Sequence, residues 1–223
     1  MNRFLDALGA GPLLADGAMG SYIFELTGRL SEPNHVYESF SLDRPEVIRD
    51  VYLGYLRAGS RCLTTNTFAA NADCLAVDGL AERLVDLNRA AIDVAREAAE
   101  QYRASEGGEE IFVLASVGPT TDPDQDDAST FDAYQEQLAA ISGADALLLE
   151  TFRSLASLRQ VLSTVAQIPN RPPIIAQMAV QQDADGWSTH KKRTGRMHTC
   201  SFWRVVGAVA ARSVSGQDTC PTR

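Results

Sequence analysis

The chain of 223 residues carries 20 basic and 29 acidic side chains, a formal net charge of −9, which fits one acidic domain of ordinary size. This charge argues against a nucleic-acid or anionic-membrane partner, because such surfaces are bound through clustered Lys and Arg. No run approaches the roughly 18 apolar residues of a membrane helix, and Asp6 interrupts any signal-peptide core. We therefore expect a cytoplasmic protein.

The charge is divided unevenly along the chain. Residues 1–182 contain 13 Arg, no Lys and 26 acidic residues, a net charge of −13, whereas residues 183–223 contain 7 basic and 3 acidic residues, a net charge of +4. Both lysines and both tryptophans fall in the second segment. We therefore predict one domain over residues 1–182 and an aberrant tail over residues 183–223, out of frame or disordered.

Short apolar runs typical of buried parallel strands alternate with longer segments of helical period. The predicted strands cover residues 13–16, 62–66, 111–116, 146–150 and 174–180. The predicted helices cover residues 45–59, 80–102, 130–141 and 155–165; Pro45 is tolerated in the first turn of the first helix, and Gly59 ends it. Strands separated by helices imply right-handed crossovers and a parallel sheet.

Four of the predicted strands end in small polar or acidic residues: Asp16, Asn66, Ser116 and Glu150. In an α/β barrel the polar residues that do chemistry come from the carboxyl ends of several strands. No GxGxxG follows the first strand and no Walker motif is found in the sequence, which removes the main support for a nucleotide-binding doubly wound sheet. The pattern favours the α/β barrel class.

These strand ends, in their order and spacing, resemble the homocysteine S-methyltransferase family over about residues 10–182. The resemblance implies a (β/α)8 TIM barrel in which a zinc ion, held by three cysteine thiolates, activates the thiol of homocysteine for methyl transfer. Zinc would act by lowering the pKa of that thiol. The motifs that carry the resemblance are LADGAMGS at residues 14–21, TTNTFAAN at 64–71, SVGP at 116–119 and LETF at 149–152.

The resemblance also implies a substrate site. Asp16 and Glu150 would hold the homocysteine ammonium group through charge-assisted hydrogen bonds; the alternatives are a turn cap at Asp16 and a surface acid at Glu150. A turn around residues 17–21 would bring backbone amides to the substrate carboxylate, although a plain tight turn explains its glycines equally well. The complete set of predicted substrate-binding residues is Asp16, Gly17, Met19, Gly20, Ser21, Asn66, Thr67 and Glu150.

Asn66 and Thr67 have a second interpretation, bracing of the neighbouring loops. The zinc ligands of the family are absent, because no Asn-Cys pair and no Gly-Gly-Cys-Cys run is found in this sequence. We expect Cys62 and Cys74 to be buried structural thiols, and Cys220 matches no ligand pattern. His190, His198 and Cys200 are suitable zinc-ligand types, yet nothing in their spacing favours a site over a chance cluster. Cobalamin or folate would act only through other domains.

The chain offers about five βα units. Three more units of roughly 30 residues each do not fit into the 41 residues after position 182, so we predict an incomplete barrel with an irregular tail. Our hypothesis is a shift of the coding frame near residue 183; an alternative exon or a genuine short variant would also produce such a tail. The function predicted by family is methyl transfer from a donor to homocysteine, giving methionine.

The alternative function is an inactive truncated remnant that acts at most as a binding or interaction module. A Schiff-base aldolase on the same barrel is disfavoured, because the predicted strands contain no lysine. The parts that would specify the methyl donor lie outside the four motifs. Methylfolate through cobalamin, S-methylmethionine, S-adenosylmethionine and betaine therefore all stay candidate donors.

Overall fold

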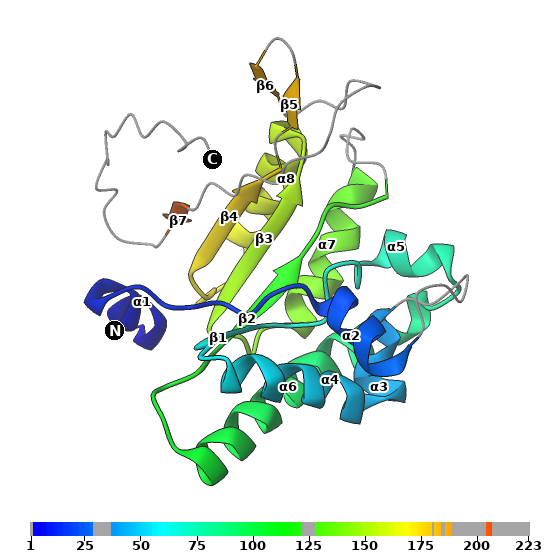
Figure 1. Ribbon diagram of the computed structural model, residues 1–223. Coiled ribbons are helices and arrows are strands. Elements are labelled where there is room, and N and C mark those ends of the chain that lie inside the picture. The colour runs from blue at the N-terminus through cyan, green and yellow to red at the C-terminus, as the bar shows by residue number, and fades with distance from the viewer. Residues whose placement is uncertain are drawn as a thin grey trace.

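In the computed structural model, four parallel strands alternate with helices (Figure 1). The structure describes residues 2–28, 37–121 and 128–179, together with the backbone of 181–183, 186–188 and 204–206; of residues 128–131 it describes only the backbone. Among these residues no helix is both long and apolar enough to cross a membrane. The four parallel strands are β1 (Cys62–Thr64), β2 (Phe112–Val117), β3 (Ala146–Phe152) and β4 (Ile174–Met178).

The sheet has the order β1-β2-β3-β4-β7, with β7 (Arg204–Val206) antiparallel to β4. A separate two-stranded sheet joins β5 (Gln181–Asp183) to β6 (Gly186–Ser188). The strands predicted to begin at residues 62, 111, 146 and 174 are confirmed. The last of them was expected to end at Val180, which lies outside the described residues. Most of the predicted tail lies outside them too.

The strand predicted at residues 13–16 is wrong in extent. It is reduced to a single parallel bridge between Ala15 and Cys62, although the Asp16 N–H still donates to the Cys62 carbonyl at 2.9 Å. The segment is short because Pro12 has no N–H to extend the ladder, and because among the described residues only β1 pairs with it. It nevertheless places Asp16 beside the end of β1.

The four predicted helices are confirmed, with boundaries shifted by a few residues. They are α4 (Pro45–Arg57), α6 (Leu84–Glu106), α7 (Ala128–Ala140) and α8 (Leu155–Ala166). A 3-10 turn η2 (Ala81–Arg83) precedes α6. Cys74 lies on α5 (Ala72–Val77). Four further elements were not among the predicted ones: α1 (Arg3–Ala10), α2 (Met19–Thr27), η1 (Tyr37–Ser39) and α3 (Phe40–Asp43).

The two faces of the sheet carry separate apolar clusters, because successive strand side chains point to opposite faces. Leu147 and Leu149 of β3 belong to the cluster shared with α4, α6, α7 and α8, which we call the helix-side core. Ala146 and Leu148 belong to the other cluster, on the inner face, which includes Phe4 of α1. Helix α1 therefore covers part of the inner face of the sheet (Figure 1).

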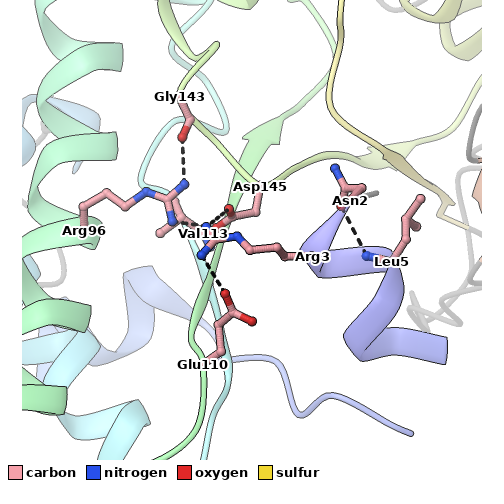
Figure 2. A network of polar contacts seen from close by, with 8 residues as sticks. All are labelled: Asn2, Arg3, Leu5, Arg96, Glu110, Val113, Gly143 and Asp145. Carbon is pink, nitrogen blue, oxygen red and sulfur yellow. Dashed lines mark hydrogen bonds and ion pairs between the residues drawn. The ribbon is translucent and has the colours of Figure 1, made fainter. Parts of the chain in front are cut away.

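An ion-pair network ties α1 and α6 to the amino-terminal ends of β2 and β3 (Figure 2). The Asp145 carboxylate accepts from the Arg96 guanidinium at 2.6 Å and from the Val113 N–H at 2.8 Å. Arg3 of α1 lies 2.8 Å from Glu110 and 3.8 Å from Asp145. The partly buried carboxylate before β3 therefore accepts from one charged donor and one backbone donor.

Candidate functional site

A cavity of about 500 Å³ opens at the carboxyl ends of the parallel strands. This volume falls within the range of about 300–1,000 Å³ usual for small-molecule sites. Its walls come from the segment after the Ala15 bridge, from η1, and from the ends of β1, β2, β3 and β4. The lining residues are Ala15, Asp16, Gly17, Ala18, Met19, Gly20, Tyr37, Glu38, Thr64, Thr65, Asn66, Phe68, Leu114, Ser116, Leu148, Glu150 and Gln177.

Asp16 is held in the cavity wall by β1. Its carboxylate accepts from the Thr64 N–H and from the Thr64 hydroxyl, both at 2.7 Å. Burial raises the pKa of Asp16 to about 7, although the bonds from Thr64 and the charge of Glu150 also act on it, the first lowering and the second raising the value. Asp16 thus lies where ionisation at neutral pH is costly without a cation.

Glu150 projects into the same cavity from β3. The Ser116 hydroxyl of β2 donates to its carboxylate at 2.5 Å. Burial is the main cause that raises the pKa of Glu150, opposed by the bond from Ser116. Among the described residues that line the cavity there is no Lys, Arg or His. Among the described residues, two partly buried carboxylates therefore face one space without a protein cation in its lining.

The segment expected to be a turn over residues 17–21 is in fact a helix start, since α2 begins at Met19. Ala18 at its N-cap provides no side-chain bond to the first N–H groups of α2. Met19 and Gly20 line the cavity, whereas Ser21 lies in the same turn but is exposed and outside the lining.

Gly17 has a packing reason to lack a side chain. A Cβ at this position would lie 2.8 Å from the hydroxyl oxygen of Tyr55 on α4. That hydroxyl donates to the carbonyl oxygen of Ala18 at 3.1 Å. Tyr55 therefore fixes the backbone that joins Asp16 to α2, and the glycine lets it approach.

Asn66 and Thr67 brace loops, in agreement with the second of their two interpretations. The Asn66 amide donates to the Tyr37 carbonyl at 2.6 Å, which ties η1 to the end of β1. The Thr67 hydroxyl donates to the Ser116 carbonyl at 2.7 Å, and its side chain is fully buried. Asn66 also lines the cavity and Thr67 does not, so a substrate contact stays a prediction for both.

Sequence reasoning missed Glu38, a third carboxylate in the cavity wall. The Ala69 N–H donates to it at 2.8 Å, and burial raises its pKa. Glu38 lies in η1 rather than at a strand end, so the strand-end rule that selected the other residues could not find it. Its only sequence signal is an acidic residue a few positions before Pro45, the start of α4.

No three His, Cys, Asp or Glu side chains in the described part of the chain come together as a metal site. Cys62 is buried in β1, where burial raises the pKa of its thiol to about 12, so it resists forming the thiolate that binds metal. The Cys74 thiol is partly buried and donates to the Pro119 carbonyl at 3.8 Å. Cys62 is buried as predicted, whereas Cys74 is buried only in part, and neither lines the cavity. His190, His198 and Cys200 lie outside the described residues.

Comparison with known proteins identifies relatives of this chain. The family model described as homocysteine S-methyltransferase matches residues 13–205. The methionine synthase of Mycobacterium tuberculosis is 30% identical over 164 residues, 70% of this chain and 14% of that protein. The methionine synthase of Mycobacterium leprae is 28% identical over 164 residues.

Solved structures of the homocysteine methyltransferase MmuM from Escherichia coli have the same fold. The oxidized form has a TM-score of 0.71 at 26% identity and covers 84% of this chain and 69% of its own. The metallated form has a TM-score of 0.63 at 26% identity and covers 72% and 61%. The chain thus spans about one seventh of the mycobacterial methionine synthase and about two thirds of the E. coli enzyme.

Proposed function

The chain belongs to the homocysteine S-methyltransferase family, and we propose that its cavity binds homocysteine as the acceptor of a methyl group. The observation that carries the proposal is the pair of partly buried carboxylates, Asp16 and Glu150, that face one cavity with no cation among its described lining residues. A ligand with an ammonium group supplies the missing charge. Transfer of a methyl group to the homocysteine thiol, giving methionine, is the proposed reaction.

The two carboxylates suit an ammonium group better than an isolated metal ion. An ammonium offers three donors, and oxygens on Asp16 and Glu150 that already accept from Thr64 and Ser116 are held in position for it. When the ammonium binds, its charge favours the ionised form of both carboxyls, because an opposite charge nearby opposes the effect of burial. Binding therefore relieves the cost that burial imposes on these groups.

The other end of the amino acid fits the start of α2. The N–H groups of Met19 and Gly20 lie in the first turn of that helix, where backbone dipoles favour an anion. Asp16 stands three positions earlier in the chain, so an ammonium and a carboxylate on the same carbon atom can be held together. The space that remains in the cavity is left for the side chain with its thiol and for the methyl donor.

The zinc ion implied by the family resemblance does not fit the described residues. Their two thiols, Cys62 and Cys74, lie outside the cavity lining, and no cluster of suitable ligands forms. We therefore derive no step through zinc. The role proposed for this chain's own residues is to bind and orient homocysteine.

Calorimetric titration with L-homocysteine tests the proposal. We expect the wild-type chain to bind, and Asp16→Asn and Glu150→Gln to bind about 10- to 100-fold more weakly, since each loses a charge-assisted bond of about 1.5–3 kcal/mol. The matched control is Glu82→Gln on the exposed η2, which should bind as the wild type does.

A second ligand separates the ammonium from the rest of the molecule. 4-Mercaptobutanoate has the carboxylate and thiol of homocysteine and lacks the amino group, so it should bind weakly to the wild type and no more weakly to Asp16→Asn. Homocysteine that fails to bind the wild type, or that binds both variants with unchanged affinity, would contradict the proposed function.

A further inference from the structure

Strand β3 departs from regular alternation directly after Glu150. Leu147 and Leu149 point to the helix-side core, and Ala146 and Leu148 to the inner face. Regular alternation keeps Glu150 on the inner side, where it lines the cavity, and would direct Phe152 to the same side. Phe152 is instead fully buried in the helix-side core.

The register between β3 and β4 shows how the change occurs. Leu149 pairs with Ala176, and Phe152 is the next residue of β3 to pair, with Met178. Two residues of β3, Glu150 and Thr151, therefore lie opposite the single residue Gln177. This is the two-against-one arrangement of a β-bulge, which re-aims side chains next to functional sites.

The extra residue has an uncommon backbone conformation. Thr151 has φ of 62°, in the left-handed region, which β-branched residues rarely adopt. The conformation persists because both neighbours of Thr151 are fixed. On one side, the Glu150 carboxylate accepts from the Ser116 hydroxyl. On the other, the Phe152 side chain is buried and the Phe152 carbonyl accepts from the Ala179 N–H at 2.8 Å. Strain of this kind is kept where the neighbouring structure over-determines it.

We propose that Thr151 is a positioning residue: its left-handed backbone keeps Glu150 directed into the cavity and turns Phe152 out of it. If Thr151 were extended, Phe152 would return to the inner side, one pleat beyond Glu150 and towards the mouth of the cavity. A large ring would then occupy space that the ligand needs. The identity of the ligand in this inference rests on the proposed function. The geometry rests on β3 and its pairing with β4.

Three substitutions separate the backbone of Thr151 from its side chain. Thr151→Gly removes the hydroxyl and accepts the left-handed conformation without strain. Thr151→Ala removes the same hydroxyl and keeps a Cβ. Thr151→Pro fixes φ near −65° and excludes the conformation. Each is compared with the wild type by carbon-13 NMR titration of the Glu150 carboxyl, by calorimetric titration with L-homocysteine, and by thermal unfolding.

We expect Thr151→Gly to bind homocysteine within threefold of the wild type, to keep the raised pKa of Glu150, and to unfold at a higher temperature than Thr151→Ala. We expect Thr151→Pro to bind at least tenfold more weakly, with the pKa of Glu150 moved back towards its ordinary value as the carboxyl leaves the cavity. The other carboxyls that face this space, Asp16 and Glu38, are followed in the same spectra. A merely structural role for Thr151 would change the unfolding temperature and leave the Glu150 titration unchanged.

Several results would overturn the proposal. A tenfold loss of affinity in Thr151→Gly would assign the role to the hydroxyl, and wild-type affinity in Thr151→Pro would remove the need for the left-handed backbone. If Thr151→Pro does not fold, the proposal is tested by comparing Thr151→Gly with Thr151→Ala. Equal unfolding temperatures of these two variants would overturn it, because a left-handed backbone at this position should favour glycine over alanine. If the wild type does not bind homocysteine, the proposed function fails, while the Glu150 titration still tests Thr151.

Discussion

The two ends of the parallel sheet hold partly buried carboxylates in opposite ways. At the amino-terminal end, Asp145 is bonded to the Arg96 guanidinium and to the Val113 N–H. At the carboxyl end, Asp16 and Glu150 accept only uncharged donors from Thr64 and Ser116 among the described residues. Composition alone would not separate these acids, since all three lie next to the same parallel strands.

This difference indicates that the amino-terminal end of the sheet stabilises the fold and that the carboxyl end binds a ligand. An acid paired with arginine is compensated within the protein and contributes to the folded state, as is usual at the amino-terminal face of α/β barrels. An acid with a raised pKa and no neighbouring cation makes the folded state less stable when it ionises, a cost that is accepted where a ligand supplies the charge. Each of the following predictions changes one end and should leave the other unaltered.

The largest effect is expected at the amino-terminal end. Asp145→Ala removes a carboxylate whose side chain is 12% exposed, takes the carboxylate partner from the Arg96 guanidinium, and leaves the Val113 N–H without its acceptor. The free energy of unfolding should fall by about 3 kcal/mol, the upper end of the range for loss of a hydrogen bond to a charged group. Denaturant unfolding measures this change.

The control for this prediction is Glu97→Ala, which breaks the more exposed pair with Arg49 and should cost less than about 1 kcal/mol. Homocysteine affinity should be the same in both variants wherever the protein is folded. A reduced affinity in folded Asp145→Ala would show that the two ends are coupled.

At the carboxyl end, Asp16→Asn should have the opposite effect on stability. The raised pKa of about 7 means that the folded state binds a proton which the unfolded state has lost, so the stability of the wild type falls as pH rises from about 4 to about 7. The variant cannot ionise. The shift of about 3 units in the pKa of Asp16 corresponds to about 4 kcal/mol at pH 8, at about 1.4 kcal/mol for each unit. The variant loses one of the two bonds from Thr64, which costs about 1–2 kcal/mol, so it should be more stable than the wild type by about 2–3 kcal/mol at pH 8 and less stable by about 1–2 kcal/mol at pH 3.5.

Denaturant unfolding of both proteins at the two pH values measures this difference. The variant should lose homocysteine binding while it gains stability, as expected of a residue kept for function. A variant that is less stable at pH 8 would mean that the bonds to Thr64 contribute more than the charge costs.

The pairing of Asp16 with Glu150 could be predicted from the sequence, since polar residues at the ends of parallel strands meet at one edge of a sheet. The start of α2 could not, because Ala18 provides none of the usual capping signals. Glu38 could not be predicted either, because it reaches the cavity through the packing of η1, fixed by the long-range bond from Asn66 to Tyr37. The bulge at Thr151 could not be predicted from the sequence, since threonine is common in regular strands.

A smaller effect is expected from pH on the wild-type site. Below pH 7 the ammonium of homocysteine must displace the proton of Asp16, whose pKa is about 7. Affinity should therefore fall by up to about tenfold for each unit below pH 7, about 1.4 kcal/mol. The neighbouring carboxyls Glu150 and Glu38, with pKa values also raised by burial, should steepen the fall at the acidic end.

Calorimetric titrations from pH 5 to pH 8 measure this dependence. Asp16→Asn provides the control, because its weak remaining affinity should vary less over the same range. An affinity of the wild type that does not change with pH would show that the ammonium does not contact Asp16 and would remove the contrast between the two ends.

The smallest effect is expected from Tyr55, whose hydroxyl holds the backbone before α2. Tyr55→Phe removes the bond from the hydroxyl to the Ala18 carbonyl, and at this exposed position the free energy of unfolding should fall by only about 0.5–1 kcal/mol. Homocysteine affinity should fall about two- to threefold, because the backbone of residues 17–19 is less firmly held. Tyr102→Phe on α6, outside the cavity lining, is the matched control and should change neither quantity beyond error. If Tyr55→Phe lowers stability and leaves affinity intact, the tyrosine supports the fold at this end of the sheet without serving the ligand.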